Sequence, residues 1–415
     1  MCTMSLSNRG NKQINILFLT IGRMESIENR GIYSDLMRTL RDHGHTVYTV
    51  SPYEKRTGKK TELIEENGVH MLHVSTGNVT GSSNLIKKGL ATLMLETLFI
   101  RGIKKYFPQV TFDLVLYSTP PITFAKVVKY VKKRCGAETY LLLKDIFPQN
   151  AVDIGMMKKT GIKGLLYRHF RAKEKKLYAL SDRIGCMSKA NVDYILKQNP
   201  EIPIHKVEIC PNAIEVQDMS VTPEVRAELR QKYGIPQDKK VFVYGGNLSR
   251  PQGIPFLIKC LEEEKDNSEA YFLIVGAGTE YKKLEAWFAE HKPHNAKLLK
   301  RLPKEDYTRL AAACDVGMIF LDHRFTIPNF PSRLLAYLQA KLPVLCCTDP
   351  NTDVGKVCVE GGFGWWCQSN DTAAFGRMVD AALRADLPAM GETGYQYLNE
   401  HYTTQKAYEI LVNDH

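Results

Sequence analysis

Residues 241–253, with the sequence VFVYGGNLSRPQG, combine residue types that could hold a phosphate. An apolar run breaks into Gly245-Gly246-Asn247, and a helix is expected to follow. Glycines let the backbone approach a phosphate, and the free N–H groups at a helix start can bind one. A charge-assisted bond from Arg250 to phosphate would contribute about 1.5–3 kcal/mol. A plain strand-to-helix turn would give the same pattern, because short glycine motifs are weak signals. The further donors in this loop are Asn247, Ser249 and Gln252.

Short apolar runs bounded by polar residues recur through the first half of the chain and are typical of buried parallel strands. The first of these runs ends just before Gly22, and a helix is expected from there, near 34–42. The alternation of such runs with helical stretches predicts a parallel sheet. The predicted strands are 14–20, 46–50, 70–75, 113–118, 139–143, 183–187 and 206–210.

The alternation starts again after the polar segment 215–237, with strands predicted at 241–244, 271–275, 296–300, 316–321 and 344–347. We therefore predict an α/β protein with two Rossmann-like domains, at 1–213 and 214–388. A C-terminal helix within 389–415 is expected to pack back toward the first domain. Since open α/β sheets bind ligands beyond the carboxyl ends of their strands, we expect the catalytic site in a cleft between the two domains.

Composition narrows the class of protein. Of 415 residues, 44% are hydrophobic and 24% are charged, which is usual for soluble globular proteins. No uncharged apolar run reaches the ~20 residues that cross a bilayer, and the first 13 residues lack the core of a signal peptide. The ten cysteines form no CxxC pair and no cluster at zinc-ligand spacing. We expect a cytoplasmic protein with buried, reduced cysteines and no metal site.

The net charge of +11 is unevenly distributed. Residues 1–213 hold 33 Lys and Arg against 18 Asp and Glu, a balance of +15, whereas the remainder carries −4. A basic half indicates an anionic partner, either a membrane surface or nucleic acid. No aromatic-rich RNA-binding motif or recognition helix is present, so we expect a membrane surface and no nucleic acid.

Two helical stretches are candidates for contact with that membrane surface. Residues 85–107 are apolar through their middle with lysines and arginines at both ends, which suits either a helix dipping into a membrane or a core helix. Residues 158–180 are amphipathic, and a solvated basic face is favoured there over a lipid contact. The apolar stripe of this second stretch is Ile162, Leu166, Phe170 and Leu177.

Four segments together resemble the retaining glycosyltransferases of family 4, which have the GT-B fold of two Rossmann-like domains. The resemblance covers nearly the whole chain and is closest to bacterial O-antigen and capsule enzymes, including the WbuB-like N-acetylfucosamine transferases. The four segments are Ser118-Thr119-Pro120-Pro121, Lys144-Asp145-Ile146-Phe147-Pro148, Gly246-Asn247 with Gln252-Gly253, and Pro331-Ser332-Arg333 running to Pro343-Val344.

The resemblance implies roles for particular residues. The loop from Gly246 to Gly253 matches the diphosphate-binding loop, with Asn247, Ser249 and Gln252 as contacts. Gly276 and Gly278 match the turn near the nucleotide, and Leu302 lies where the family recognises the base. On the acceptor side the matching residues are Gly22, Ser118 and Pro120. Asp145 falls on the acceptor wall, where a carboxylate could deprotonate a hydroxyl, although Asp is also a favoured helix N-cap.

The sequence departs from the family at two positions. Family members usually carry two glutamates eight positions apart before the final helix, and Pro328 and Ala336 stand in their places. Neither side chain can accept a ribose hydroxyl. Arg333 would place a cation by the diphosphate at a helix start, or be a surface residue. Nearby polar side chains that could contact the donor are Asn329, Ser332, Asp349, Thr352 and Asp353, and Asx turns explain the last three equally well.

The resemblance implies a metal-independent, retaining transfer from a nucleotide sugar, most simply a UDP-sugar, without any other cofactor. Arg250 and Arg333 would stabilise the leaving diphosphate. The acceptor would be a saccharide on a lipid pyrophosphate, met peripherally at the inner membrane face. A GT-B nucleotide-sugar epimerase and a non-catalytic subunit of a polysaccharide assembly complex stay open as alternatives. A dinucleotide oxidoreductase is disfavoured, since no GxGxxG with an acidic ribose ligand occurs.

Overall fold

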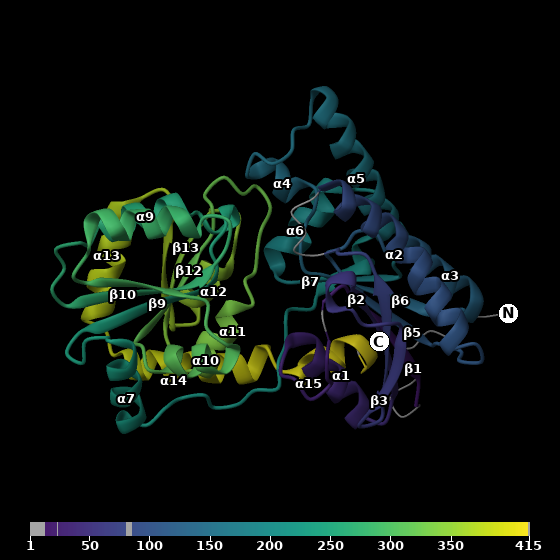
Figure 1. Cartoon of the computed structure of the whole chain (residues 1–415), viewed down its shortest axis with the longest axis horizontal. Helices are drawn as coiled ribbons and strands as arrows, with labels where there is room; N and C mark the ends of the chain where they lie inside the picture. Colours follow the sequence, from purple (N-terminus) through teal and green to yellow (C-terminus); the bar gives the residue numbers. More distant parts are fainter. Residues whose placement is uncertain (1–12, 23, 80–84, 414–415) are drawn as a thin grey trace. The chain divides into compact units, whose positions relative to one another are not determined.

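The computed structural model describes residues 13–22, 24–79 and 85–413. The chain divides into two compact units; in Figure 1 the first is coloured from purple to teal with a yellow C-terminal stretch, and the second from teal through green to yellow. The first unit comprises Met1–Glu215 and Thr403–His415, and the second comprises Val216–Tyr402. The first unit is therefore built from two separate stretches of the chain.

The first unit contains an eight-stranded sheet in the order β3-β4-β2-β1-β5-β6-β7-β8. Its strands are β1 (Asn15–Leu19), β2 (Thr46–Glu54), β3 (Glu62–Glu66), β4 (Val69–Thr76), β5 (Leu114–Ser118), β6 (Glu138–Leu143), β7 (Arg183–Cys186) and β8 (Val207–Ile209). Its helices are α1 (Ile32–Asp42), α2 (Leu85–Tyr106), α3 (Ala125–Cys135), α4 (Gln149–Asp153), α5 (Gly161–Leu180), α6 (Lys189–Gln198) and α15 (Thr404–Tyr408), with short turns η2 (Lys55–Thr57), η3 (Ile204–Lys206) and η5 (Glu409–Asn413).

Every predicted strand of this unit is present, and one strand was not predicted. β3 pairs antiparallel with β4 at the edge of an otherwise parallel sheet. The two strands are joined by Asn67 and Gly68, with φ of 48° and 78°. Positive φ at both residues suits a tight hairpin turn, for which Asn-Gly is the strongest short signal. The pattern ELIEE of β3 is mostly exposed, so it lacks the apolar run by which the other strands were found.

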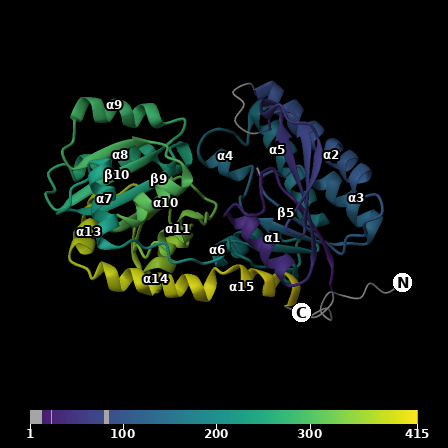
Figure 2. The same ribbon diagram turned by 60° about the horizontal axis from the view of Figure 1, so that its bottom comes forward.

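Helices cover both faces of the first sheet. One face packs against α1 and against the chain end around Tyr408 and Leu411. On the other face, Tyr48 meets Phe107 just beyond α2. Helix α2 contacts β4 and α3, and α3 contacts α5, an arrangement that can be followed in Figure 2. Side chains alternate along a strand, so both sets of helices bury apolar residues of the same strands.

An ion cluster on α1 holds Glu215, the last residue of the first stretch of this unit. Arg38 of α1 contacts Asp35 and Glu215, each through Nη2 at 2.7 Å. The backbone N–H of Glu215 donates to the Asp35 carboxylate, and Arg38 also donates to the Ile27 carbonyl. Next to this cluster, Ile214 forms a bridge with Thr403. Both chain segments that enter and leave this unit are thus held against α1.

The second unit contains a six-stranded parallel sheet in the order β11-β10-β9-β12-β13-β14. Its strands are β9 (Lys240–Asn247), β10 (Ala270–Ala277), β11 (Ala296–Lys300), β12 (Val316–Phe320), β13 (Val344–Thr348) and β14 (Gly364–Gln368). Its helices are α7 (Pro223–Tyr233), α8 (Ile254–Glu263), α9 (Tyr281–His291), α10 (Lys304–Ala312), α11 (Arg333–Gln339), α12 (Val354–Glu360), α13 (Thr372–Leu383) and α14 (Leu387–His401), with the short turn η4 (Arg250–Gln252).

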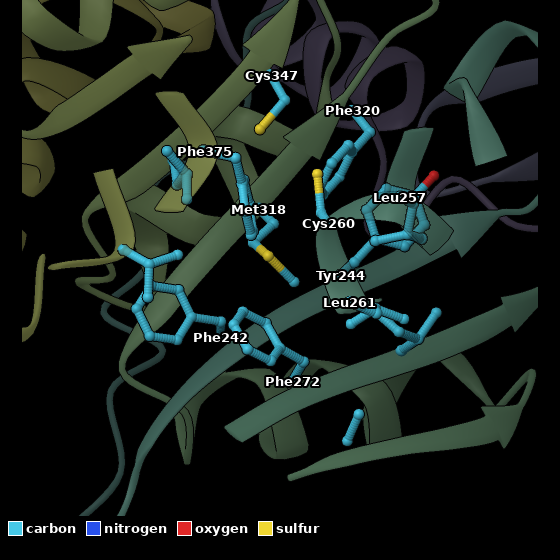
Figure 3. Close-up of a cluster of buried hydrophobic side chains, with 14 of the residues drawn as sticks. Phe242, Tyr244, Leu257, Cys260, Leu261, Phe272, Met318, Phe320, Cys347 and Phe375 are labelled. Atoms are coloured by element: carbon cyan, nitrogen blue, oxygen red, sulfur yellow. The ribbon is translucent and has the colours of Figure 1, made fainter. Parts of the chain in front are cut away.

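This is the Rossmann strand order. Successive strands are added in one direction from β9 to β11 and in the opposite direction from β12 to β14, so the topological switch point lies between β9 and β12. The main core of the unit lies on the face covered by α8, α9 and α13, where Phe242, Phe272 and Phe320 meet Leu257 and other side chains (Figure 3). Helix α13 packs on α8, while α11 packs on α14. The five predicted strands are confirmed, and β14, with the sequence GWWCQ, was not predicted.

Two helix interpretations can now be tested. In α2, Leu95, Phe99 and Ile103 are fully buried, which supports the core alternative for this part of the helix. The predicted stripe of α5 is only partly buried: Leu177 is fully covered, whereas Leu166 is 49% exposed. In the part of the chain that the structure describes, no helix is both long and apolar enough to cross a bilayer.

Candidate functional site

A pocket of about 380 Å³ opens at the carboxyl ends of β9, β10 and β11. Its volume is in the range of small-molecule sites, and its place at the strand ends is where open α/β sheets bind ligands. Four predicted donor-binding residues line it, namely Gly246, Asn247, Gly276 and Leu302. Its other lining residues are Val275, Ala277, Arg301, Lys304 and Tyr307.

The predicted glycines at the end of β10 allow close packing of backbone on backbone. A Cβ on Gly276 would lie 2.2 Å from the carbonyl oxygen of Gly246, its partner on β9, and one on Gly278 would lie 2.2 Å from that of Leu248. The ends of β9 and β10 and the residues after them therefore approach too closely for a side chain at these two positions. Gly278 is used in this contact and does not line the pocket.

The segment after β9 has the predicted order of strand, loop and helix. Strand β9 continues through Asn247, and α8 begins only at Ile254, with Gly253 as its N-cap. Within the loop, Asn247 donates to the Ser249 hydroxyl, which donates to Gln252 Oε1, both at 2.8 Å. This relay brings three predicted donor-binding side chains together and fixes the loop shape without a helix start at Asn247.

Arg333 lies against the same loop. A Cβ on Gly246 would be 2.7 Å from Arg333 Nη2, so the guanidinium touches the bare backbone of Gly246, whose φ is +130°. The guanidinium also lies 4.2 Å from the centre of the Tyr244 ring, a cation–π contact. Among the described residues no carboxylate pairs with it. Burial opposes its charge, but neighbouring tyrosines outweigh this effect and raise the pKa of Arg333.

Three tyrosines that were not predicted surround this cation. They come from β9 (Tyr244), α10 (Tyr307) and α11 (Tyr337). Strands β9 and β12 pair at only two positions before they diverge. Where they diverge, the Tyr337 hydroxyl donates to the carbonyl of Val243 on β9 and to that of Met318 on β12, each at 3.1 Å. For Tyr244 and Tyr337 the available signal was a tyrosine within an otherwise apolar stretch, because a buried hydroxyl needs a hydrogen-bond partner, whereas Tyr307 lies among polar residues.

The other predicted cation, Arg250, has a different setting. Its side chain is 57% exposed, and its Nε is 3.9 Å from Glu280 Oε1. Arg250 therefore lies outside the pocket lining and already faces a carboxylate, whereas Arg333 does not. Ser332, just before α11, is exposed, as is Ala336 on that helix. Because the side chain of Ala336 is a methyl group, this position of the helix has no side-chain hydrogen-bond acceptor.

The predicted residues near the end of β13 are engaged with one another. The Asp349 carboxylate accepts the backbone N–H of Asn351 and of Thr352 and the Thr352 hydroxyl, at 2.8–3.0 Å. These bonds form the Asx turn that was the alternative to sugar binding. The Thr352 hydroxyl oxygen accepts the N–H of Asn329 at 3.0 Å, and Asp353 precedes α12. None of these residues lines the 380 Å³ pocket.

In the first unit, the predicted acceptor-side residues lie at the ends of three neighbouring strands, β1, β5 and β6. Gly22 lines a pocket of about 240 Å³ together with Thr20 and Tyr33. Burial raises the pKa of Tyr33, and its hydrogen bond with Ser118 opposes this effect. Gly22 and Ser118 are thus joined through Tyr33. Pro120 is exposed and follows a cis peptide bond.

Asp145 lies at the end of β6, and its surroundings correct the capping alternative. Helix α4 has Pro148 at its N-cap, and the Asp145 carboxylate instead accepts from Asn150 Nδ2, at 2.8 and 2.9 Å. The Thr119 hydroxyl donates to the Asp145 carbonyl at 3.1 Å, which ties the two family-like segments together. Burial raises the pKa of Asp145 to about 6. A carboxyl group with such a pKa can exchange a proton near neutral pH.

Comparisons with known proteins agree with this geometry. Residues 225–396 match the family model described as Glycosyl transferases group 1. The chain is 26% identical over 326 residues to the probable glycosyltransferase WbjE of Pseudomonas aeruginosa, covering 78% of this chain and 79% of WbjE. Residues 225–396, which match the family model, include Arg333 and the residues that line the 380 Å³ pocket.

Two solved structures share the architecture. HepE of Anabaena, in complex with UDP-glucose, superposes with a TM-score of 0.66 at 13% identity over 96% of this chain and 98% of HepE. WaaG, a glycosyltransferase involved in lipopolysaccharide biosynthesis, gives a TM-score of 0.64 at 15% identity over 96% of this chain and the whole of WaaG. The fold is GT-B, residues 225–396 form a glycosyltransferase group 1 domain, and these matches support a glycosyltransferase.

Proposed function

We propose that this chain, which carries a glycosyltransferase group 1 domain on a GT-B fold, is a retaining, metal-independent enzyme of family 4. Its donor is a nucleotide sugar, most simply a UDP-hexose or UDP-N-acetylhexosamine. Its acceptor is a saccharide on a polyprenyl pyrophosphate, in the synthesis of a surface polysaccharide such as O-antigen or capsule. The match to HepE, which was solved with UDP-glucose, supports the donor class.

The observation that carries this proposal is the setting of Arg333. Its guanidinium is surrounded by tyrosines, touches the Gly246 backbone and forms no ion pair with a described carboxylate. A largely desolvated cation gains most from an anion that arrives in a fixed place, and Arg matches phosphate geometry well. A nucleoside diphosphate in the adjoining pocket supplies that anion.

Charge stabilisation at this point would assist the transfer. A bond forms between the acceptor oxygen and the anomeric carbon as the bond from that carbon to the diphosphate breaks. The diphosphate leaves with the bonding electrons and takes the acceptor proton. Arg333, with Arg250 at the loop, holds the charge that develops on the leaving group, which is electrostatic preorganisation. Attack on the face that the diphosphate leaves retains the configuration.

The acceptor side is assigned to the first unit. Gly22, Ser118 and Pro120 lie at the ends of neighbouring strands there, near the end of the strand that carries Asp145. A carboxyl group with a pKa of about 6 is mostly ionised at neutral pH and is suited to orient the acceptor hydroxyl, whose proton passes to the diphosphate. Asn150 holds this carboxylate in one orientation.

The lipid carrier places the enzyme at the inner face of the cell membrane. The first unit has an excess of basic residues, and three of its large apolar side chains are exposed near the connection of α4 to α5: Met156, Leu165 and Leu166 at 63%, 60% and 49%. Exposed bases lie beside them at Lys158, Lys159 and Arg168. Apolar side chains flanked by bases suit an anionic bilayer surface, at about 1 kcal/mol for each base.

A thermal-shift screen against UDP, GDP, dTDP, ADP and their sugars tests donor binding. A ligand at a hundred times its Kd stabilises the folded protein by about 2.7 kcal/mol. We expect one nucleotide class to raise the Tm of the native protein, Arg333→Ala to abolish this rise, and Arg309→Ala, which alters an exposed arginine of α10, to retain it. No rise with any nucleotide would contradict the proposal.

A second measurement separates transfer from binding alone. Release of free nucleotide from the donor that binds should require the lipid-linked acceptor. The absence of a carboxylate at Ala336 favours one other function, a donor-binding subunit without transferase activity. Binding without acceptor-dependent release would support that function, and release with inversion or epimerisation of the sugar would contradict retention.

A further inference from the structure

The hydroxyl oxygen of Tyr307 is buried and has no hydrogen-bond partner. Nine-tenths or more of buried polar groups do have one, and an unpaired group costs about 1–3 kcal/mol. Tyr307 lines the 380 Å³ pocket and comes from α10. A buried hydroxyl without a partner beside a binding pocket indicates a hydrogen bond that is completed by a ligand.

The position of Tyr307 is fixed by the neighbouring backbone. A Cβ on Gly245 would lie 1.9 Å from the Tyr307 hydroxyl oxygen, so the ring end occupies the space where any other residue would carry its side chain. Gly245 has no positive φ, so space and not backbone conformation is what requires glycine here. The tyrosine hydroxyl therefore reaches the backbone immediately before Gly246 and Asn247.

The hydroxyls of the three tyrosines around Arg333 have different partners. Tyr244 donates to the Asn247 carbonyl at 2.8 Å, and Tyr337 donates to the Val243 and Met318 carbonyls. Of these three hydroxyls, only that of Tyr307 makes no hydrogen bond to a carbonyl, and the polar group beside it is the Tyr337 hydroxyl, whose own proton is already donated. Burial raises the pKa of Tyr307 well above its usual value, so the group stays protonated and can donate.

We propose that Tyr307 is a donor-binding residue whose hydroxyl donates to a phosphate oxygen of the nucleoside diphosphate, beside the Arg333 guanidinium. The assignment rests on the proposed function. A charged acceptor is the partner that a neutral O–H next to an unpaired cation binds most strongly. Arg333 supplies the charge and Tyr307 supplies a directed bond, so the two together fix the position of the leaving group.

Three tyrosine-to-phenylalanine variants test this proposal. Tyr307→Phe removes a hydroxyl without a partner, so the Tm of the free protein should stay the same or rise. Tyr337→Phe removes a hydroxyl bound to two carbonyls, so its Tm should fall. Isothermal titration with UDP should show affinity reduced tenfold or more in Tyr307→Phe, the usual effect of a hydrogen bond to a charged group, and nearly unchanged in Tyr395→Phe, which alters the α14 tyrosine that contacts Lys341.

Inorganic pyrophosphate, which lacks the ribose and the base, identifies the group that the hydroxyl binds. It should raise the Tm of the native protein and of Tyr395→Phe, and raise that of Tyr307→Phe less. An equal response of Tyr307→Phe to pyrophosphate, or unchanged UDP affinity, would overturn the assignment while the proposed function stands. Failure of the native protein to bind UDP or any other nucleotide would overturn both.

Discussion

Both carboxylate oxygens of Asp145 accept hydrogen bonds from one amide nitrogen, Nδ2 of Asn150, at 2.8 and 2.9 Å. Burial raises the pKa of this carboxyl to about 6, and the bonds from the Ile146 backbone and Asn150 act against that rise. The ionised form is therefore stabilised by a neighbour five residues along the chain. Asn150 thus controls the pH at which Asp145 can accept a proton.

We predict that kcat/KM rises with pH through an inflection near 6, because Asp145 must lose its proton to act on the acceptor. Asn150→Ala removes a bond to the charged form, so the inflection should move to higher pH. Asp145→Asn should remove the inflection together with most of the activity. Asp193→Asn, which alters an exposed carboxylate of α6, is the control, and a shift with Asn150→Ala no larger than with this control would argue against the role.

Gly245→Ala should collapse the donor pocket, because its methyl group would need the space of the Tyr307 ring end. Overpacking of this kind typically costs 1–3 kcal/mol, and about 1 kcal/mol lowers the Tm of a unit of this size by roughly 2–4 °C. UDP affinity should fall as well, since Tyr307 lines the pocket. Thermal denaturation with and without UDP measures both effects.

Gly376→Ala provides a matched control for that substitution. This glycine lies in α13, where an added Cβ would approach only the flexible end of Glu264, at 2.9 Å. Alanine favours a helix over glycine, so stability should hold or improve. Adding Tyr307→Ala to Gly245→Ala should recover stability relative to the sum of the two single changes. Strict additivity would mean that the two residues do not compete for space.

Acid should destabilise the first unit through His73. This side chain is 1% exposed, lies 2.9 Å through Nδ1 from the Ser51 hydroxyl and stacks on Tyr53. Burial lowers the pKa of His73 to about 4, whereas an unfolded histidine titrates near 6.5. The unfolded chain therefore takes up the proton first. Stability should be complete above pH 6.5 and decrease by about 3 kcal/mol as the pH falls to 4.

Urea denaturation at pH 7.5, 6, 5 and 4 measures this loss. In His73→Gln the decrease between pH 6.5 and 4 should be smaller than in the native protein, because the titrating group is gone. His205→Gln, which alters an exposed histidine, should retain the native dependence on pH. Equal slopes in all three proteins would exclude His73 as the acid-sensitive group.

The exposed apolar residues of α5 should carry membrane binding. The double variant Leu165→Glu with Leu166→Glu places charge where the two side chains would enter the bilayer, so binding to vesicles rich in anionic lipid should fall at least tenfold. Ile204→Glu introduces the same charge at another exposed apolar residue of the first unit, 74% exposed, and should bind as the native protein does. Cosedimentation compares the three, and an equal loss for Ile204→Glu would point to a nonspecific charge effect.

The parallel strands could be predicted because burial on both faces requires continuous apolar runs. The runs at Ile14 and Val241 are examples, and each lies in a central strand. Two edge strands, β3 and β14, escaped this rule, whereas the edge strands β8 and β11 were predicted. Strand β3 is mostly exposed, so the Asn67-Gly68 turn is the sequence signal that indicates it. Strand β14 has one partner strand, and its apolar run contains Trp366, which is 37% exposed.

The candidate site was predictable where the loop pattern or the family resemblance pointed to it. Gly246 and Asn247 line the donor pocket as the loop pattern indicated, and Gly276 and Leu302 line it as the resemblance implied. The tyrosines around Arg333 come from β9, α10 and α11, which only tertiary packing brings together. Asp145 and its partner Asn150 are five residues apart, yet the sequence pattern offered a helix cap for Asp145 and not this bond. Which polar side chains already have hydrogen-bond partners depends on this packing and cannot be read from residue spacing.

The interrupted make-up of the first unit affects the order in which the protein can fold during synthesis. Ala407, Tyr408 and Leu411 belong to the core beneath α1, yet they follow the whole second unit in the chain. The second unit is continuous and can close as soon as it leaves the ribosome. The N-terminal unit, although translated first, keeps an open hydrophobic face until residues 407–411 have also been synthesised, so it is the part most exposed to chaperones and to aggregation.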